Sequence, residues 1–159
     1  MAGVPVIVEV IMLVARGGEL AYRAVRRPLA VDDEPDSVAR AAWDLPPDTT
    51  DGLLHSTSWR HESGRVILTY VALPDPDPSA RHAAVAGWVA RGENGMEPSP
   101  DVELAEVAAH AARHLSFLEH TDDEVAKALA PHPAIRRLLT RYAPAMAGQV
   151  ADSDEPDGL

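Results

Sequence analysis

The stretch LLHSTSWRHESGRVILTYVAL, residues 53–73, decides the fold that we expect for this chain. Two runs rich in β-branched and aromatic residues lie on either side of Ser63-Gly64, a dipeptide that favours a two-residue turn. With this turn, Glu62 faces Arg65 across the two strands as an ion pair. The stretch therefore predicts a long antiparallel hairpin.

Counting outward from the turn assigns the side chains of this hairpin to two faces. Regular pairing gives the opposed pairs Trp59–Leu68, Thr57–Tyr70 and His55–Ala72. One face then holds His55, Thr57, Trp59, His61, Val66, Leu68 and Tyr70. Neither face is purely polar, so we expect a central hairpin that is covered on both sides, with Trp59, Leu68 and Tyr70 in the core.

The residues before the hairpin predict a second hairpin and a short helix. Val4 to Ala15 is apolar and β-branched, as expected for a strand that is buried on both faces. Residues 16–18 are a turn signal, and Glu19 to Arg27 continues as the second arm. An acidic loop over residues 28–36 precedes a helix predicted over Ser37–Leu45, capped by the residue at its start or the aspartate before it.

The residues after the hairpin change from strand to helix. Residues 83–91 fit a strand or a helix, of which we favour the strand, and residues 92–98 form a loop. Ser99 is the expected N-cap of a helix whose apolar face consists of Leu104, Ala108, Ala111, Leu115 and Leu118. A second helix is predicted from a capping box of Thr121 and Glu124, and a third holds Ile135, Leu138 and Leu139 on its inner side.

This order of elements predicts one domain of the α+β or mixed α/β class. We expect a mostly antiparallel sheet with a short helix after the second strand and about three C-terminal helices packed on it. The domain spans residues 1–147, with a sheet-rich part over 4–91 and a helical part over 99–146. The polar, acidic residues 148–159 are expected to be disordered.

The composition excludes several classes of function. A formal net charge of −11 and the lack of a basic run argue against nucleic-acid binding. The absence of cysteine excludes disulfides, thiol catalysis and cysteine-bound metals. The apolar N-terminal run is interrupted by Glu9 and is too short to span a bilayer, so no membrane association and a cytoplasmic location are expected.

Histidines and serines offer weak signals for catalysis or metal binding. Glu106, His110 and His114 recur at one-turn spacing and are an alternative metal-ligand set on one helix. Ala111 and Ala112 stand where a zinc protease needs its glutamate base, so a solvated helix face is the favoured interpretation. No Gly-x-Ser-x-Gly or phosphate-binding glycine loop occurs, so we assign no catalytic residue.

Three arginines, Arg23, Arg26 and Arg27, gather at the end of the second predicted strand. Their guanidinium groups could hold a phosphate, because their geometry matches phosphate oxygens. A charged edge strand that pairs with the acids of the following loop is the alternative.

The order of these elements resembles that of the Nudix hydrolases. Over about residues 4–91, a buried strand, an arm ending in arginines, an acidic loop, a helix and a long hairpin follow one another as in that family. SVARAAWDL (37–45) falls where the helix of that family would lie, and GRVILTYVAL (64–73) looks like its next strand. The resemblance implies the fold of that family.

The signature of the family, however, is degenerate in this sequence. When the arginine of the signature is aligned on Arg40, its first glycine falls on Arg26 and its first glutamate on Asp32. The remaining glutamates and glycine are replaced by Ala41, Asp44, Leu45 and Pro47. In the family those glutamates bind the Mg²⁺ that activates water, so the resemblance implies the fold without most of the metal site.

We therefore expect a non-catalytic domain that binds either a small ligand, for example a phosphorylated one, or a protein partner. The expected ligand-binding residues are Arg23, Arg27, His55, Trp59, His61 and Tyr70, because arginine meets anionic groups and aromatic rings stack on flat ones. The alternative is a divergent Mg²⁺-dependent phosphohydrolase of nucleoside diphosphate derivatives that uses Asp32 and Asp44. A third hypothesis is an interaction protein that docks through residues 99–146, for example as a homodimer.

Overall fold

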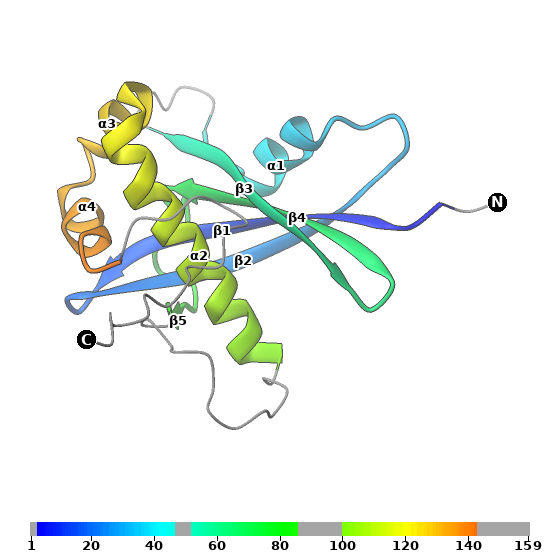
Figure 1. The fold of residues 1–159 in the computed structure, drawn as a ribbon, viewed down its shortest axis with the longest axis horizontal. Coiled ribbons are helices and arrows are strands. Elements are labelled where there is room, and N and C mark those ends of the chain that lie inside the picture. Colours follow the sequence, from blue (N-terminus) through cyan, green and yellow to red (C-terminus); the bar gives the residue numbers. More distant parts are fainter. Residues whose placement is uncertain (1–2, 47–51, 86–99, 143–159) are drawn as a thin grey trace, which may run out of the picture.

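Five strands form one mixed sheet and four helices pack around it in the part of the chain that the structure describes (Figure 1). The structure is a computed structural model and describes residues 3–46, 52–85 and 100–142. The strand order across the sheet is β3-β4-β1-β2-β5. This arrangement confirms the expected class, with a mostly antiparallel sheet, a short helix after the second strand and three later helices.

Strand β1 (Val6–Arg16) lies at the centre of the sheet and forms the first hairpin with β2 (Glu19–Leu29). Gly17 and Gly18 join them with φ of 60° and 77°, the positive values that a tight hairpin turn requires. β1 pairs antiparallel with β2 and parallel with β4 (Arg65–Leu73). Most of β1 is buried, as predicted from its apolar residues on both sides of the strand.

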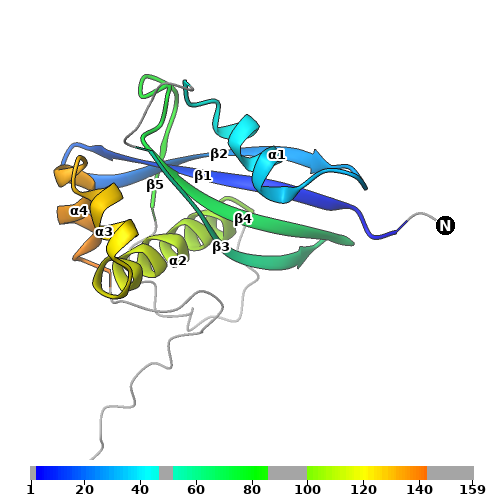
Figure 2. The same ribbon diagram turned by 90° about the horizontal axis from the view of Figure 1, so that it is seen from above.

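Helix α1 (Pro35–Trp43) covers one face of the sheet, which we call the α1 face (Figure 2). The predicted start at Ser37 was wrong by two residues. Glu34 is the N-cap and Pro35 lies in the first turn, where its missing amide hydrogen costs no intrahelical bond. The helix ends at Asp44, which has the left-handed conformation (φ 58°).

The predicted second hairpin is confirmed. It consists of β3 (Leu53–Glu62) and β4, joined at Ser63 and Gly64 with φ of 51° and 77°. Glu62 lies opposite Arg65 across the turn, and their side chains form an ion pair of 3.3 Å.

A β-bulge at Thr57 makes part of the predicted register wrong. Trp59 lies opposite Leu68 as predicted, but the register shifts between Ser56 and Ser58, so no residue of β4 is paired with Thr57 in the register. The pairs beyond the bulge are Ser56–Tyr70, His55–Val71 and Leu54–Ala72. His55 therefore lies on the opposite face of the sheet from Trp59 and His61.

The hairpin is also not covered on both sides as predicted. Among the described strands, β3 is an edge of the sheet. Trp59 is 64% exposed, whereas Tyr70 on the inner strand is buried as expected. The prediction for Trp59 was wrong because tryptophan is apolar enough to suggest a core position, although the strand that carries it has a neighbour on one side.

Helix α2 (Pro100–Thr121) crosses the other face of the sheet, which we call the α2 face, while α3 (Asp123–Leu129) and α4 (Pro133–Leu139) lie at one end (Figure 2). β5 (Ala83–Ala84) is short and pairs with β2, so the start of the ambiguous segment is a strand. The predictions for residues 86–91, 92–98 and 148–159 lie outside the described residues.

The three predicted helices are confirmed, although the capping box is not. The N-cap of α3 is Asp122, whose Oδ1 accepts hydrogen bonds from the amides of Glu124 (2.9 Å) and Val125 (3.4 Å). The Thr121 hydroxyl instead donates to the Phe117 carbonyl (3.0 Å). None of the described helices combines the length and the apolar character that a membrane span requires.

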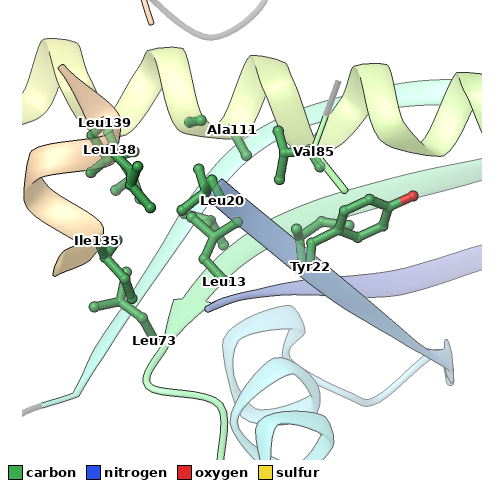
Figure 3. Close-up of a cluster of buried hydrophobic side chains, with 14 of the residues drawn as sticks. Leu13, Leu20, Tyr22, Leu73, Val85, Ala111, Ile135, Leu138 and Leu139 are labelled. Carbon is green, nitrogen blue, oxygen red and sulfur yellow. The ribbon is translucent and has the colours of Figure 1, made fainter. Parts of the chain in front are cut away.

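The core has one part on each face of the sheet. On the α2 face, Leu13, Leu20 and Leu73 of the strands meet Ala111 of α2 and Ile135 of α4 (Figure 3). The smaller part lies under α1. Its buried members are Val8, Val10, Met12, Ala39, Ala42, Trp43, Tyr70 and Ala72.

Candidate functional site

A cavity of about 460 Å³ lies where the start of β3 meets the end of α1 and helix α3. These three segments are far apart in the sequence, and α3 lies beside the start of β3 (Figure 1). The lining residues are Arg40 and Trp43 of α1, Gly52 to His55 at the start of β3, and Asp122, Glu124, Val125, Lys127, Ala128 and Pro131 around α3.

The wall of the cavity beside α1 is fixed in place by Trp43. Its side chain is buried, and its Nε1 donates a hydrogen bond to the Pro74 carbonyl (2.9 Å). Gly52 packs directly on the indole, because a Cβ added there would lie 2.5 Å from Trp43 Cη2 and 2.8 Å from Leu45 Cδ2. No residue with a side chain fits this position without displacing the indole.

The two cations and two acids that line the cavity have formal charges that sum to zero, but they are not all paired with one another. Lys127 pairs with Glu124 at 3.6 Å, and Asp122 is engaged in capping α3. The guanidinium of Arg40, which is exposed, has no ion pair or hydrogen bond with any described residue. Arg40 is therefore the cation of this cavity whose charge is available to a bound anion.

His55 adds an imidazole ring to the lining of the cavity. Its ring meets that of His114 on α2 edge-on, with ring centroids 5.4 Å apart and an interplanar angle of 62°. Its Nδ1 lies 2.8 Å from the Ser56 carbonyl oxygen. Burial, together with the charge of His55, lowers the pKa of His114.

The structure separates the six sequence-predicted ligand residues, and His55 is the one that lines the cavity. Trp59 and His61 lie together on the α1 face near the edge of the sheet, with ring centroids 5.5 Å apart. Tyr70 is buried, and its hydroxyl donates to Asp36 Oδ1 (2.6 Å). Burial, followed by this hydrogen bond, raises the pKa of Tyr70.

The two predicted arginines are also placed apart from the cavity. Arg27 is exposed, and its side chain donates to the carbonyl of Arg26. Arg23 holds the buried carboxylate of Asp75 with both ends of its guanidinium, and its Nε lies 2.9 Å from Oδ2. His82 Nε2 lies 2.7 Å from the same carboxylate, so Arg23 fixes the segment after β4.

A buried ion network occupies the α2 face of the sheet, away from the cavity. Glu9 is fully buried and accepts from Arg26 Nε (2.8 Å), Arg60 Nη1 (3.0 Å) and Thr69 Oγ1 (3.1 Å). The sequence carries a signal for part of it, because counting from the Gly17-Gly18 turn pairs Glu9 with Arg26 and a buried carboxylate needs a partner.

The alternative metal sites are not assembled. No group of three or more His, Cys, Asp or Glu side chains suited to a metal ion occurs among the described residues. Glu106, His110 and His114 therefore do not form the predicted ligand set, since His110 is exposed while His114 contacts His55. Asp32 and Asp44 are exposed and do not join such a group either.

Comparison with known proteins gives no relative. No protein-family model, no curated protein and no solved structure matches this chain. Its function is therefore inferred from the arrangement of its own residues.

Proposed function

We propose that this protein binds a small anionic ligand, without catalysis, in the cavity between α1, β3 and α3. The observation that carries the proposal is that Arg40 lines the cavity and that its guanidinium has no partner among the described residues. Lys127 contributes less, because Glu124 already compensates its charge. An anion at Arg40 would gain a charge-assisted, bidentate contact that the protein itself leaves open.

The size and the walls of the cavity suit a ligand that also has an apolar part. About 460 Å³ lies within the usual range for small-molecule sites, which is roughly 300–1,000 Å³. Trp43, Leu53 and Val125 supply apolar surface, and the fixed indole means that this wall needs little rearrangement on binding.

We also propose that the fold is a degenerate relative of the Nudix fold. The order of β1, β2, α1 and the β3–β4 hairpin supports this, and Arg40 is the residue that aligns with the arginine of the family signature. A divergent hydrolase has less support, since the described acids form no metal-ligating group. The hypothesis of docking through α2 has less support, because alanines of this helix pack in the core.

A thermal-shift panel of phosphate, sulfate, carboxylates, nucleotides and nucleotide sugars, with and without Mg²⁺, tests the proposal. A ligand at 100 times its Kd stabilises the fold by about 2.7 kcal/mol, which raises the melting midpoint measurably. The variant Arg40→Ala should abolish the shift for every ligand that raises the wild-type midpoint.

The matched control is Arg137→Ala. Arg137 is an exposed arginine on α4 that does not line the cavity and has no side-chain partner among the described residues. Its removal should leave the ligand-induced shift intact. Equal shifts in the wild type and in Arg40→Ala would contradict the proposal, and Mg²⁺-dependent turnover of a nucleotide would favour the hydrolase instead.

A further inference from the structure

His55, which lines the cavity, forms a ring contact with a second titratable side chain, that of His114. The bulge at Thr57 turns His55 toward the α2 face, where its ring meets His114 at 5.4 Å between centroids. His55 also lines the cavity that we propose as the ligand site. Its state of protonation therefore changes the charge of the cavity wall.

Hydrogen bonding fixes which nitrogen of His55 gains a proton. Nδ1 lies 2.8 Å from the Ser56 carbonyl oxygen, and a carbonyl accepts hydrogen bonds but cannot donate them. Nδ1 therefore carries the hydrogen in the neutral ring. Protonation adds an N–H at Nε2 and a full positive charge to the ring.

The surroundings disfavour the charged form of His114. Burial, followed by the charge of His55, lowers the pKa of His114. The charged residues that line the cavity together with His55 are Arg40 of α1 and, on α3 and its N-cap, Asp122, Glu124 and Lys127, while the residue paired with His55 on β4 is the apolar Val71. Since Lys127 pairs with Glu124 and Asp122 caps α3, Arg40 is the cation of this set without an ion pair to a described residue.

We infer that His55, in its imidazolium form, is the second cationic group that holds an oxyanion such as a phosphoryl or sulfate group in the cavity beside Arg40. Affinity for the oxyanion rises as the pH falls through the imidazole range, because protonation adds a positive charge to the wall. By linkage, a bound oxyanion makes His55 harder to deprotonate. This inference rests on the proposed function, since it concerns the same cavity.

Sulfate is the probe that tests the inference, because it stays a dianion from pH 5.5 to pH 8.0. Its affinity is measured by NMR titration of the full chain at constant ionic strength. We expect sulfate to bind at least about fivefold more tightly at pH 5.5 than at pH 8.0, the lower end of typical coupling between sites. His55→Gln should keep the weaker, pH-independent binding to Arg40.

Two other histidine variants separate His55 from its neighbours. His61→Gln removes an exposed histidine from the same strand but from the opposite face of the sheet, so it should keep the pH dependence of the wild type. His114→Gln should also keep it, because the imidazole that we place at the bound oxyanion is that of His55.

The outcomes distinguish this inference from the proposed function. Sulfate affinity that depends on Arg40 but is equal at both pH values would overturn the inference and leave the proposed function standing. Sulfate binding at neither pH would overturn the inference, and a thermal-shift panel without any Arg40-dependent ligand would overturn the proposed function. Loss of the pH dependence in His114→Gln but not in His55→Gln would show that His114, and not His55, is the histidine that acts on the bound oxyanion, and would overturn the inference.

Discussion

Glu9 shows how one charged residue can be accommodated in an otherwise apolar central strand. It is fully buried, and two arginines and a threonine saturate its carboxylate. Removing its charge leaves Arg26 and Arg60 partly buried without their shared counter-ion. The loss of this carboxylate costs more free energy of unfolding than the intact ion pairs contribute, because the arginine charges that remain are still desolvated.

We predict that Glu9→Gln lowers the free energy of unfolding by about 3–5 kcal/mol. Denaturant unfolding followed by circular dichroism measures this loss. Glu19→Gln, on the exposed turn end of β2, is the control and should change the stability by less than about 0.5 kcal/mol. A loss for Glu9→Gln as small as that of the control would mean that the network is not formed.

Gly52 is a second position at which a small change should affect stability, because a single added carbon atom would collide with its neighbours. We predict that Gly52→Ala destabilises the protein by about 1–3 kcal/mol, because the added Cβ overpacks against the fixed indole of Trp43. Gly3→Ala, whose Cβ would meet nothing within 4 Å, should be neutral in the same unfolding experiment. Equal stability of the two variants would show that Trp43 moves freely.

The buried carboxyl group of Asp75 should make the stability of the protein depend on pH. Burial acts to raise the pKa of its carboxyl, but the hydrogen bonds from Arg23, the Asp77 amide and His82 outweigh burial and hold the pKa below its usual value. A carboxyl whose pKa is lower in the folded than in the unfolded protein stabilises the fold above its unfolded pKa, near 3.9. That stabilisation is lost as the pH falls through the folded pKa.

We therefore predict that Asp75→Asn removes a contribution present at pH 5 and above. The difference in free energy of unfolding between the wild type and the variant should shrink steadily as the pH falls below about 4. A series of urea unfolding curves from pH 2 to pH 6 measures it. A difference that stays constant over this range would show that Arg23 and His82 do not hold the charged carboxylate.

At the scale of elements, hydrophobic patterns and turn residues predicted most of the fold. The Gly17-Gly18 and Ser63-Gly64 turns set both hairpins, and the apolar spacing of α2 predicted the side that packs on the sheet. The bulge at Thr57 could not be predicted in this way. A single extra residue leaves the composition of a strand unchanged but reverses the face of every residue beyond it.

The register of β3 and β4 can be checked directly. We predict cross-strand NMR contacts between the backbones of Ser56 and Tyr70 and between those of Leu54 and Ala72. Regular pairing without a bulge would instead give contacts between Thr57 and Tyr70. Observing the latter would return His55 to the face of Trp59 and His61 and would separate it from His114.

At the scale of the whole molecule, the candidate site consists of segments that the sequence keeps far apart. Its lining comes from Arg40 and Trp43 of α1, from Gly52 to His55, and from residues between 122 and 131 around α3. Sequence reasoning singled out His55, and it met Arg40 as the residue aligned with a family signature. It missed the cavity because the approach of α3 to β3 depends on how the last helices pack at one end of the sheet (Figure 2).

The position of β3 at an edge of the sheet also could not be predicted from the sequence pattern. The ambiguity between an edge and a central hairpin depends on which strand lies next to β1, and the parallel pairing of β1 with β4 leaves β3 outside. A sequence pattern describes the two faces of a strand but not its neighbours. Trp59 was consequently assigned to the core although it is exposed.

The most direct test of the central claim is a map of the backbone amide NMR shifts that sulfate or a ligand from the panel causes. Binding in the cavity predicts shifts concentrated at Gly52 to His55 and around Val125 and Ala128, all of which disappear in Arg40→Ala. Shifts centred on Trp59 and His61, or shifts that persist without the Arg40 guanidinium, would contradict the claim that this cavity is the binding site.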